Sequence, residues 1–267
     1  MKYLNTRHSL AMLEPLCTGR TLFVFDFDGT LAPIVTRRAQ AIMSRTTCAL
    51  FTRLASRVTT AVISGRSVPD LRARLKFHPD YLIGNHGLEG LTGNAAALRR
   101  AQRLCATWRQ QLESAWGKMP PAGIDVEDKH YSLAIHYRLA PEPGRARTMV
   151  ARALALLRPA PQLIPGKMVV NVLPSGAPDK GAALLQLLRR TRAQHALFIG
   201  DDDTDEAVFA LDDPRIITVR VGRKRSSRAH YYLQGQMEID AVLRYLVGFI
   251  TRQENAGKKL STRTAIG

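Results

Sequence analysis

Two carboxylates one residue apart follow an apolar run in the stretch TLFVFDFDGTLAPI, which extends from Thr21 to Ile34. These are Asp26 and Asp28, and Gly29 and Thr30 complete the sequence DFDGT. An isolated buried carboxylate is costly unless it is paired, hydrogen-bonded or bound to a metal. The pair is therefore either solvated at a strand end, where it caps the next turn, or held there for chemistry.

Three further short motifs place polar groups after predicted strands or at the starts of predicted helices. VISGR contains Ser64, and PDKG contains Lys180. LFIGDDDTDE contains four acids: Asp201, Asp202, Asp203 and Asp205. Each motif also has a plainer interpretation, since Ser and acidic residues cap helices and turns, and a lysine at a helix start can be a surface residue.

Taken together, these residue types indicate a particular chemistry. Clustered acids cannot all ionise side by side without a compensating cation. Oxygen ligands favour Mg²⁺, which binds one or two carboxylates together with substrate phosphate and water. Lys180 and Ser64 can donate to phosphate oxygens. Asp26 can act as a nucleophile, and Asp28 can protonate a leaving hydroxyl and later deprotonate water. The set predicts two-step phosphoryl transfer through an aspartyl-phosphate.

The elements that must position these residues alternate between apolar strands and helices. We expect strands over Leu22–Asp26, Thr60–Ser64, Tyr81–Gly84, Ala196–Gly200 and Ile216–Val219. We expect helices over Arg45–Arg57, Val68–Lys76, Lys180–Arg192, Asp205–Leu211 and Ile239–Gln253. This alternation predicts an α/β fold with a doubly wound parallel sheet. Ligands of such sheets bind at the carboxyl ends of the strands, where the four motifs lie.

The middle of the chain follows a different pattern. A long helix over Ala95–Trp116 precedes the stretch YSLAIHYR, whose alternation is typical of a half-exposed antiparallel strand. A second helix, about Gly144–Leu157, precedes two short strands in QLIPGKMVVNVLP. We therefore predict an inserted α+β domain. The expected division is a core of residues 1–87 and 175–267 and a small cap of residues 88–174.

These motifs, in this order, resemble those of the haloacid dehalogenase superfamily of phosphohydrolases. With GNHGLE and EDKHYSLAIHYR, the chain is similar to the trehalose-6-phosphate phosphatases over roughly Leu22–Val247. The resemblance implies a Rossmann-like core with a parallel sheet and a small α+β cap inserted after the third strand. It also implies Mg²⁺-dependent hydrolysis of trehalose 6-phosphate to trehalose and phosphate.

The resemblance also assigns roles to individual residues. Asp26 would be the nucleophile and Asp28 the general acid and base, with Ser64 and Lys180 on the phosphoryl group. The Mg²⁺ ligands would be the Asp26 side chain, the Asp28 carbonyl and Asp201, with Asp202 and Asp205 as direct or outer ligands. Glu127 and Lys129 match the E-x-K that resembles the family's sugar-binding pair. The full substrate-binding set implied is Thr30, Gly65, Arg66, Asn85, His86, Glu127, Lys129 and Asn171.

Alternatives to trehalose 6-phosphate stay open because the chain has Asn171 where the family usually has Glu. Asn keeps the hydrogen-bonding capacity and loses the charge. Another sugar phosphate, such as a sucrose, glucosyl or mannosyl phosphate, is the nearest alternative. A receiver-like phospho-acceptor module also places acids, a Ser or Thr and a Lys around Mg²⁺. Such a module has no need of Asp28 or of an inserted cap.

The composition of the chain limits which binding partners and which cellular compartment we expect. The formal net charge of +17, with arginine far commoner than lysine, could attract nucleic acid or a phosphorylated small molecule. No nucleic-acid-binding motif accompanies the charge, so we expect a sugar phosphate and no nucleic acid. No apolar run approaches the roughly 18 residues of a membrane span, and the N-terminus lacks a signal-peptide pattern. Three widely spaced cysteines, which suggest reduced thiols, favour a cytoplasmic protein, and we expect a monomer.

Overall fold

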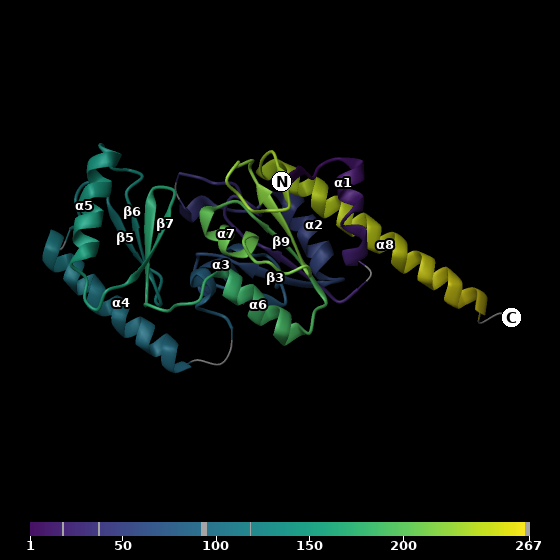
Figure 1. The fold of residues 1–267 in the computed structure, drawn as a ribbon, viewed down its shortest axis with the longest axis horizontal. Coiled ribbons are helices and arrows are strands. Elements are labelled where there is room, and N and C mark those ends of the chain that lie inside the picture. The colour runs from purple at the N-terminus through teal and green to yellow at the C-terminus, as the bar shows by residue number, and fades with distance from the viewer. Residues whose placement is uncertain (18, 37, 92–94, 118, 265–267) are drawn as a thin grey trace.

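A computed structural model describes residues 1–17, 19–36, 38–91, 95–117 and 119–264, with side chains as far as residue 256. Two sheets lie in two parts of the molecule, and the long C-terminal helix extends away from them (Figure 1). The larger sheet has seven parallel strands in the order β1-β11-β10-β9-β2-β3-β4. Their bounds are β1 Lys2–Tyr3, β2 Thr21–Phe25, β3 Thr59–Ile63, β4 Tyr81–Ile83, β9 His195–Gly200, β10 Ile216–Val221 and β11 Tyr231–Leu233.

Helices cover both faces of this sheet, which explains why its central strands are apolar throughout. All five residues of β2 are buried. Phe23 and Phe25 pack into the apolar cluster that also contains side chains of α2, α3 and α8, whereas Leu22 and Val24 pack with α6 and α7. The bounds of these helices are α2 Arg45–Ala55, α3 Val68–Arg74, α6 Lys180–Thr191, α7 Glu206–Phe209 and α8 Ile239–Thr264, and a short α1 spans Arg7–Ala11. We call this larger part the core.

The smaller sheet is antiparallel, in the order β5-β6-β8-β7, and helices α4 and α5 cover one of its faces (Figure 1). Its elements are α4 Ala95–Trp116, β5 Asp125–Asp128, β6 Leu133–His136, α5 Pro143–Ala155, β7 Gln162–Gly166 and β8 Val169–Leu173. Leu133 and Ile135 of β6 pack with Trp108 of α4 and Val150 of α5. We call this part, Ala95–Leu173, the cap.

The strand register determines which residues share the other face of the cap sheet. Glu127 pairs with Ala134, Ala134 pairs with Asn171, and Asp125 pairs with His136. Residues opposite each other on neighbouring strands point to the same face, and successive residues alternate between faces. Because Leu133 and Ile135 face the helices, the side chains of Asp125, Glu127, His136 and Asn171 share the opposite, polar face.

In the core, strand β2 lies between β9 and β3, at the point where the order of the strands reverses. The crevice outside the carboxyl ends of the strands at such a point is where open α/β sheets bind ligands. Asp26 follows β2, Ser64 follows β3, and Asp201 follows β9. The topology therefore brings three of the four sequence motifs to one edge of one sheet.

The predicted α/β fold, with a parallel sheet and a separate antiparallel sheet, is confirmed. The five predicted core strands exist, and each observed end lies within two residues of the predicted one. Strands β1 and β11, which pair with each other, were missed because two or three residues at a sheet edge carry too little pattern. The helix predicted over Asp205–Leu211 instead begins as a 3-10 turn at Asp203.

The last helix extends beyond the predicted end at Gln253, and its backbone continues to Thr264. Although α8 has 26 residues, none of the helices in the described part of the chain is long and apolar enough to cross a membrane.

Candidate active site

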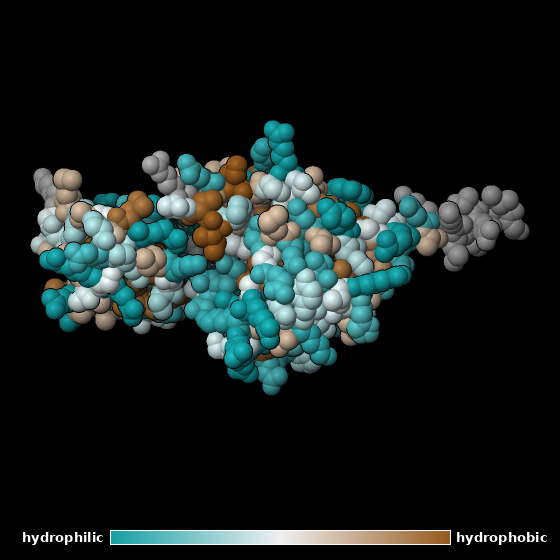
Figure 2. Space-filling model, turned by 90° about the horizontal axis from the view of Figure 1, so that it is seen from above, coloured by the Kyte–Doolittle hydropathy of each residue, from teal (hydrophilic) through white to brown (hydrophobic). Residues whose placement is uncertain are grey.

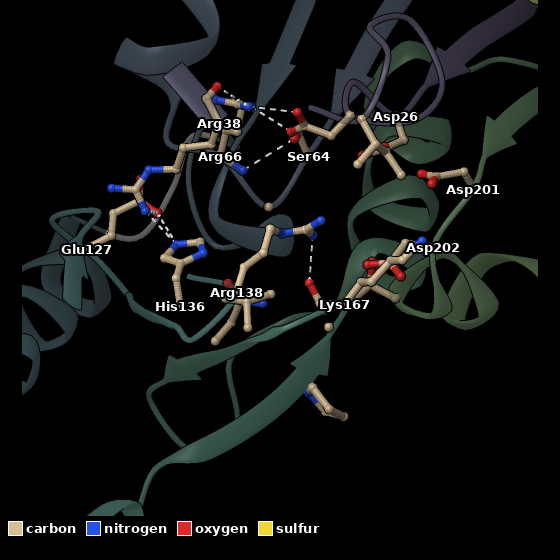
Figure 3. Close-up of a pocket in the computed structure, with 18 of the residues that line it drawn as sticks. Asp26, Arg38, Ser64, Arg66, Glu127, His136, Arg138, Lys167, Asp201 and Asp202 are labelled. Atoms are coloured by element: carbon tan, nitrogen blue, oxygen red, sulfur yellow. Dashed lines mark hydrogen bonds and ion pairs between the residues drawn. The ribbon is translucent and has the colours of Figure 1, made fainter. Parts of the chain in front are cut away.

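A cavity of about 800 Å³ lies between the carboxyl edge of the core sheet and the polar face of the cap sheet. Figure 3 shows its side chains converging from both parts of the molecule. It brings together most of the residues predicted from the sequence, namely Asp26, Asp28, Ser64, Gly65, Arg66, His86, Glu127, Lys129, Asn171, Lys180, Asp201 and Asp202. Seen from above, apolar surface gathers where the cap meets the core (Figure 2). Two exposed apolar residues, Ile34 and Leu139, line the cavity.

Lys180 is the buried cation at the centre of the core side. It begins helix α6, and Asp179 caps that helix by accepting from the Ala182 amide at 2.8 Å. Its Nζ donates to Asp26 Oδ1 at 2.8 Å and to Asp205 Oδ1 at 2.7 Å. Burial opposes the charge on Lys180, but the two carboxylates outweigh it, so its pKa is raised. The ammonium group stays charged at neutral pH.

One lysine does not balance the acids that meet there. Carboxylate oxygens of Asp26, Asp201 and Asp205 all lie within 4.8 Å of one another. Burial, together with the neighbouring carboxylates, raises the pKa of Asp26 to about 7 and that of Asp201 to about 9. Both groups would bind protons near neutral pH unless a second cation compensated their charge.

The donor set fits a hard divalent cation. Asp201 Oδ1 is buried and has no hydrogen-bond partner among the described residues. Oxygen ligands of this kind suit Mg²⁺, which would also lower the pKa values of the carboxylates that bind it. Asp205 is less free, because its second oxygen accepts from the Asp202 amide at 2.9 Å. The Asp202 carboxylate does not belong to the cluster of three.

The turn after β2 explains the glycine of DFDGT. Gly29 has φ +81° and donates its amide to the Ala32 carbonyl at 2.7 Å, which closes a tight turn. A Cβ at this position would lie 2.1 Å from Asp201 Oδ2. Glycine therefore permits both the left-handed backbone and the close approach of the β2 turn to the acid after β9.

Asp28 directly precedes Gly29 in this turn, and an arginine holds its side chain. Arg66 donates from Nε to Asp28 Oδ2 at 2.6 Å and from Nη2 to Oδ1 at 2.7 Å, and it also contacts Asp70 at 2.6 Å. Burial opposes the charge on Arg66, but the two carboxylates outweigh it and raise its pKa. Arg66 lines the cavity as predicted, with its guanidinium occupied by Asp28 and Asp70 in this structure.

Ser64 and His86 form the wall next to Lys180. Ser64 follows β3 and is buried, and its Oγ accepts from the Arg66 amide at 3.3 Å. A Cβ on Gly65 would lie 2.5 Å from His86 Cε1, so the imidazole packs directly on that glycine. Burial and the charges of Lys129 and Lys180 hold the pKa of His86 well below its usual range. The ring nitrogens are buried, Asn171 is the polar side chain next to them, and His86 lines the cavity.

The cap supplies three predicted residues to the opposite wall. Lys129 Nζ donates to the Gly65 carbonyl of the core at 2.8 Å and to Asn171 Oδ1 at 3.1 Å. Burial lowers the pKa of Lys129. Burial opposes ionisation of Glu127, but a hydrogen bond with His136 and the charges of Lys129 and Arg38 outweigh it and lower its pKa. Glu127 is therefore an ionised acceptor.

Two residues predicted to bind substrate lie away from the cavity wall. Thr30 is fully buried, and its carbonyl accepts from Gln236 at 3.3 Å. Asn85 is also fully buried and uses its side chain inside the protein. It donates to Glu89 at 2.9 Å and accepts from the cap hydroxyl of Ser132 at 2.5 Å. Asn85 therefore connects core to cap, and neither side chain lines the cavity.

Several cavity residues were not predicted from the sequence. Arg38, His136, Arg138, Lys167 and Arg220 all line the cavity. The alternation in YSLAIHYR placed His136 on the polar face of a strand, and this signal could have identified it. Arg38 lies in a 3-10 turn of a loop, Arg38–Gln40, where no periodicity exists.

Comparison with known proteins agrees with this geometry. The chain matches the family described as "Trehalose-phosphatase" over residues 24–236. A trehalose-phosphate phosphatase of Mycobacterium bovis is 30% identical over 227 residues, which cover 80% of this chain and 56% of the relative. This chain thus spans little more than half of that relative's length.

Solved structures share the fold. The C-terminal domain of the trehalose-6-phosphate phosphatase of C. albicans has a TM-score of 0.73 at 23% identity, covering 92% of this chain and 98% of that one. The sucrose-phosphatase of Synechocystis, in complex with sucrose and phosphate, has a TM-score of 0.53 at 19% identity, covering 85% and 98%. Both likenesses concern the fold alone, a parallel α/β core with a smaller antiparallel sheet.

The Gly29 turn gives a first test. Gly29→Ala should weaken Mg²⁺ binding by about 10-fold or more, because the new Cβ displaces the Asp201 carboxylate. Gly222→Ala is the matched control, since Gly222 has φ +82° and no atom within 4 Å of its Cβ position. Both variants should lose roughly 1–2 kcal/mol of stability from the left-handed backbone. Equal Mg²⁺ affinities by titration calorimetry would contradict the assignment of Asp201 to the metal.

The Lys180 contacts give a second test. Without divalent cations, Lys180→Met should lower the free energy of unfolding by about 3–5 kcal/mol, because Asp26 and Asp205 lose their buried partner. Adding Mg²⁺ should restore part of the loss, as measured by urea denaturation at one fixed pH. Lys76→Met, at an exposed position, should change stability by less than about 0.5 kcal/mol. Equal stability of the two variants would show that Lys180 does not compensate the acids.

Proposed function

Because the chain belongs to the trehalose-phosphatase family, we propose that it hydrolyses trehalose 6-phosphate to trehalose and phosphate. The observation that carries the proposal is the convergence of Asp26, Lys180 and Asp201 beneath a cap whose polar face closes the cavity. A phosphatase needs a nucleophile, charge compensation and a site for the alcohol. The cavity offers all three.

In the first step, Asp26 attacks phosphorus, and the bond between phosphorus and the sugar oxygen breaks. An aspartyl-phosphate forms on Asp26, and Asp28 gives its proton to the leaving sugar oxygen. In the second step, Asp28 takes a proton from water as that water attacks the aspartyl-phosphate, which releases phosphate and regenerates Asp26. The two steps balance without any redox partner.

We propose Mg²⁺ as the cofactor. Asp26, Asp201 and the Asp28 carbonyl would hold it, Asp202 and Asp205 would support these ligands, and the ion would neutralise charge on the phosphoryl group. Lys180 holds Asp26 and balances part of the charge that develops there. Ser64, at the end of β3, would donate to a phosphoryl oxygen.

Arg66 has a role that the sequence did not suggest. It donates two hydrogen bonds to the Asp28 carboxylate and so fixes the orientation of the group that serves as acid and base. Asp28 has to leave this contact to reach the leaving group. Arg66 thus acts on the acid and base rather than on the sugar, and Thr30 and Asn85 act by supporting the loops around it.

The cap would recognise the sugar. Glu127 and Asn171 carry acceptors, Lys129 links them to the core, and His86 offers a neutral imidazole. A sugar enclosed between these groups and the core would exclude bulk water from the phosphoryl group. With Asn171 in place of an acid, another sugar phosphate stays the nearest alternative. Neither the receiver module nor the nucleic-acid binder explains an acid in the position of Asp28 beneath a cap.

We further propose a cytoplasmic enzyme that acts as a monomer with no membrane or nucleic-acid partner. The three cysteines are free thiols, which suits a reducing compartment. Every group proposed for the chemistry comes from one chain, so no second copy is needed to complete the cavity.

A substrate panel tests the function. With Mg²⁺, phosphate release from trehalose 6-phosphate should exceed that from sucrose 6-phosphate and glucose 6-phosphate by about 10-fold or more in kcat/KM. Chelation of divalent cations should abolish it, and Asp26→Asn should lower it by about 1,000-fold or more. Equal rates on all three sugars would exclude trehalose 6-phosphate as the specific substrate. Loss of turnover with retention of a stable phosphoprotein would favour the receiver module.

Substitution of the acid and base tests the mechanism separately. Asp28→Asn should slow both chemical steps, with kcat lower by about 100-fold or more. It should leave Mg²⁺ affinity nearly unchanged, because only the backbone carbonyl of residue 28 is assigned to the ion. The measurements are single-turnover kinetics for each step and calorimetric titration of Mg²⁺. A collapse of metal affinity would show that the Asp28 side chain is itself a ligand.

A further inference from the structure

Arg38 reaches from the core into the cap across the cavity. It begins the 3-10 turn Arg38–Gln40 in the loop that follows β2. Its Nη1 donates to Glu127 Oε2 at 2.5 Å, and its Nη2 lies 3.5 Å from Asp125 Oδ2. Figure 3 shows this guanidinium beside Glu127 and His136, on the far side of the cavity from Asp201. A single core cation therefore joins two acids of one cap strand.

The contacts of Glu127 are unequal between its two oxygens. Oε2 accepts from Arg38, lies 3.0 Å from His136 Nε2 and lies 4.0 Å from Lys129 Nζ. None of the contacts found within the described ranges uses Oε1. Contacts that converge on one oxygen leave the other oxygen of the carboxylate free to accept a hydroxyl.

The partners of Glu127 also differ in origin. His136 and Lys129 belong to the cap, as Glu127 does, so these contacts persist whatever the position of the cap. Arg38 alone comes from the core, and its contact forms only when cap and core lie as they do here. His136 Nε2 also lies 2.5 Å from Arg38 Nη1.

The backbone of the segment that carries Arg38 is anchored to Arg66, the arginine that holds Asp28. The Arg38 carbonyl accepts from Arg66 Nη2 at 3.0 Å, and that same nitrogen holds Asp28. Arg74 donates to the Ala39 and Ala41 carbonyls at 2.9 and 3.0 Å. Asp70 pairs with both Arg66 and Arg74. The Arg38 side chain therefore starts from a fixed backbone.

We propose that Arg38 is a positioning residue that determines specificity for the sugar. It fixes Glu127 from the core side, so that Glu127 Oε1 accepts a hydroxyl of the sugar, and the sugar site is complete only when cap and core meet. The inference rests on the proposed function, because it concerns the alcohol part of the same substrate. Its ligand class is a phosphomonoester of a polyhydroxylated alcohol.

Two substrates separate this role from a general one. Trehalose 6-phosphate carries hydroxyls for Glu127, whereas p-nitrophenyl phosphate carries none. Arg38→Ala should lower kcat/KM for trehalose 6-phosphate by about 10-fold or more, chiefly by raising KM. The same variant should change kcat/KM for p-nitrophenyl phosphate by less than about 2-fold. Arg38→Lys should recover most of the loss. Arg45→Ala, which removes the same charge at an exposed position nearby in the sequence, should leave both substrates unchanged.

A double-mutant cycle tests whether Arg38 acts through Glu127. In a Glu127→Gln background, Arg38→Ala should cost less than about 2-fold more on trehalose 6-phosphate. Independent, multiplicative losses would overturn the proposal. Equal losses on both substrates would also overturn it, because Arg38 would then act on the chemistry or on the fold.

Failure of the proposal for Arg38 can be distinguished from failure of the proposed function. If the wild-type chain prefers another sugar phosphate, the trehalose assignment fails and the same ratio is measured with that sugar. Hydrogen exchange gives a readout without substrate. Arg38→Ala should raise exchange of the backbone amides of Asp125–Asp128 and their pairing partners Leu133–His136, whereas Arg45→Ala should not. Unchanged exchange in Arg38→Ala would overturn the proposal that Arg38 holds strand β5 of the cap from the core side.

Discussion

The structure depends on an excess of negative charge at one edge of the core sheet. Three carboxylates, from Asp26, Asp201 and Asp205, meet within 4.8 Å, and one buried lysine contacts two of them. Such a cluster is stable only where backbone geometry forces it together and a cation is supplied. Glycines make the approach possible, since a Cβ on Gly200 would lie 2.4 Å from Asp205 Cγ, just as one on Gly29 would meet Asp201. The negative charge that remains uncompensated is what would let the site hold the divalent cation that we propose.

Recognition is separated from this centre and uses its own charge balance. The cap wall pairs Glu127 with Arg38 and His136, while Lys129 turns to a core carbonyl and to Asn171. Core and cap thus meet through polar contacts, and the apolar packing of each part stays within that part. Polar contacts are more easily exchanged for contacts with substrate than apolar packing is. In the proposed function, this division would let the catalytic groups stay fixed while the sugar site forms around its ligand.

The sequence predicts those parts of the fold and the site that have a local pattern, and it does not predict those that arise from tertiary contacts. Asp26, Ser64, Lys180 and Asp201 each sit at the boundary of a strong local pattern, so their positions in the fold could be predicted before their contacts. The order of the strands, which brings these boundaries to one edge, is a tertiary property that motif spacing does not contain. Asn85 shows the opposite limit: the next residue, His86, lines the cavity, yet the side chain of Asn85 is buried in contacts to Glu89 and Ser132. Arg38 had no local signal, because its role arises from a loop meeting a strand that lies 89 residues away in the sequence.

The neutral Asn171 has a physical consequence for the whole cavity. Its Oδ1 accepts from Lys129 at 3.1 Å, so it keeps the acceptor geometry that an acid in that position would supply. It does not supply the negative charge, and Lys129, whose pKa burial lowers, is balanced mainly by Glu127. Glu127 in turn is shared with Arg38, and Arg138 and Lys167 add two further cations to the same wall. Three cations of the cap wall, Lys129, Arg138 and Lys167, therefore line the same cavity as the acid cluster. In the proposed function, this positive charge would attract a dianionic phosphate that has to approach three carboxylates, and the absence of a carboxylate at residue 171 would strengthen the attraction.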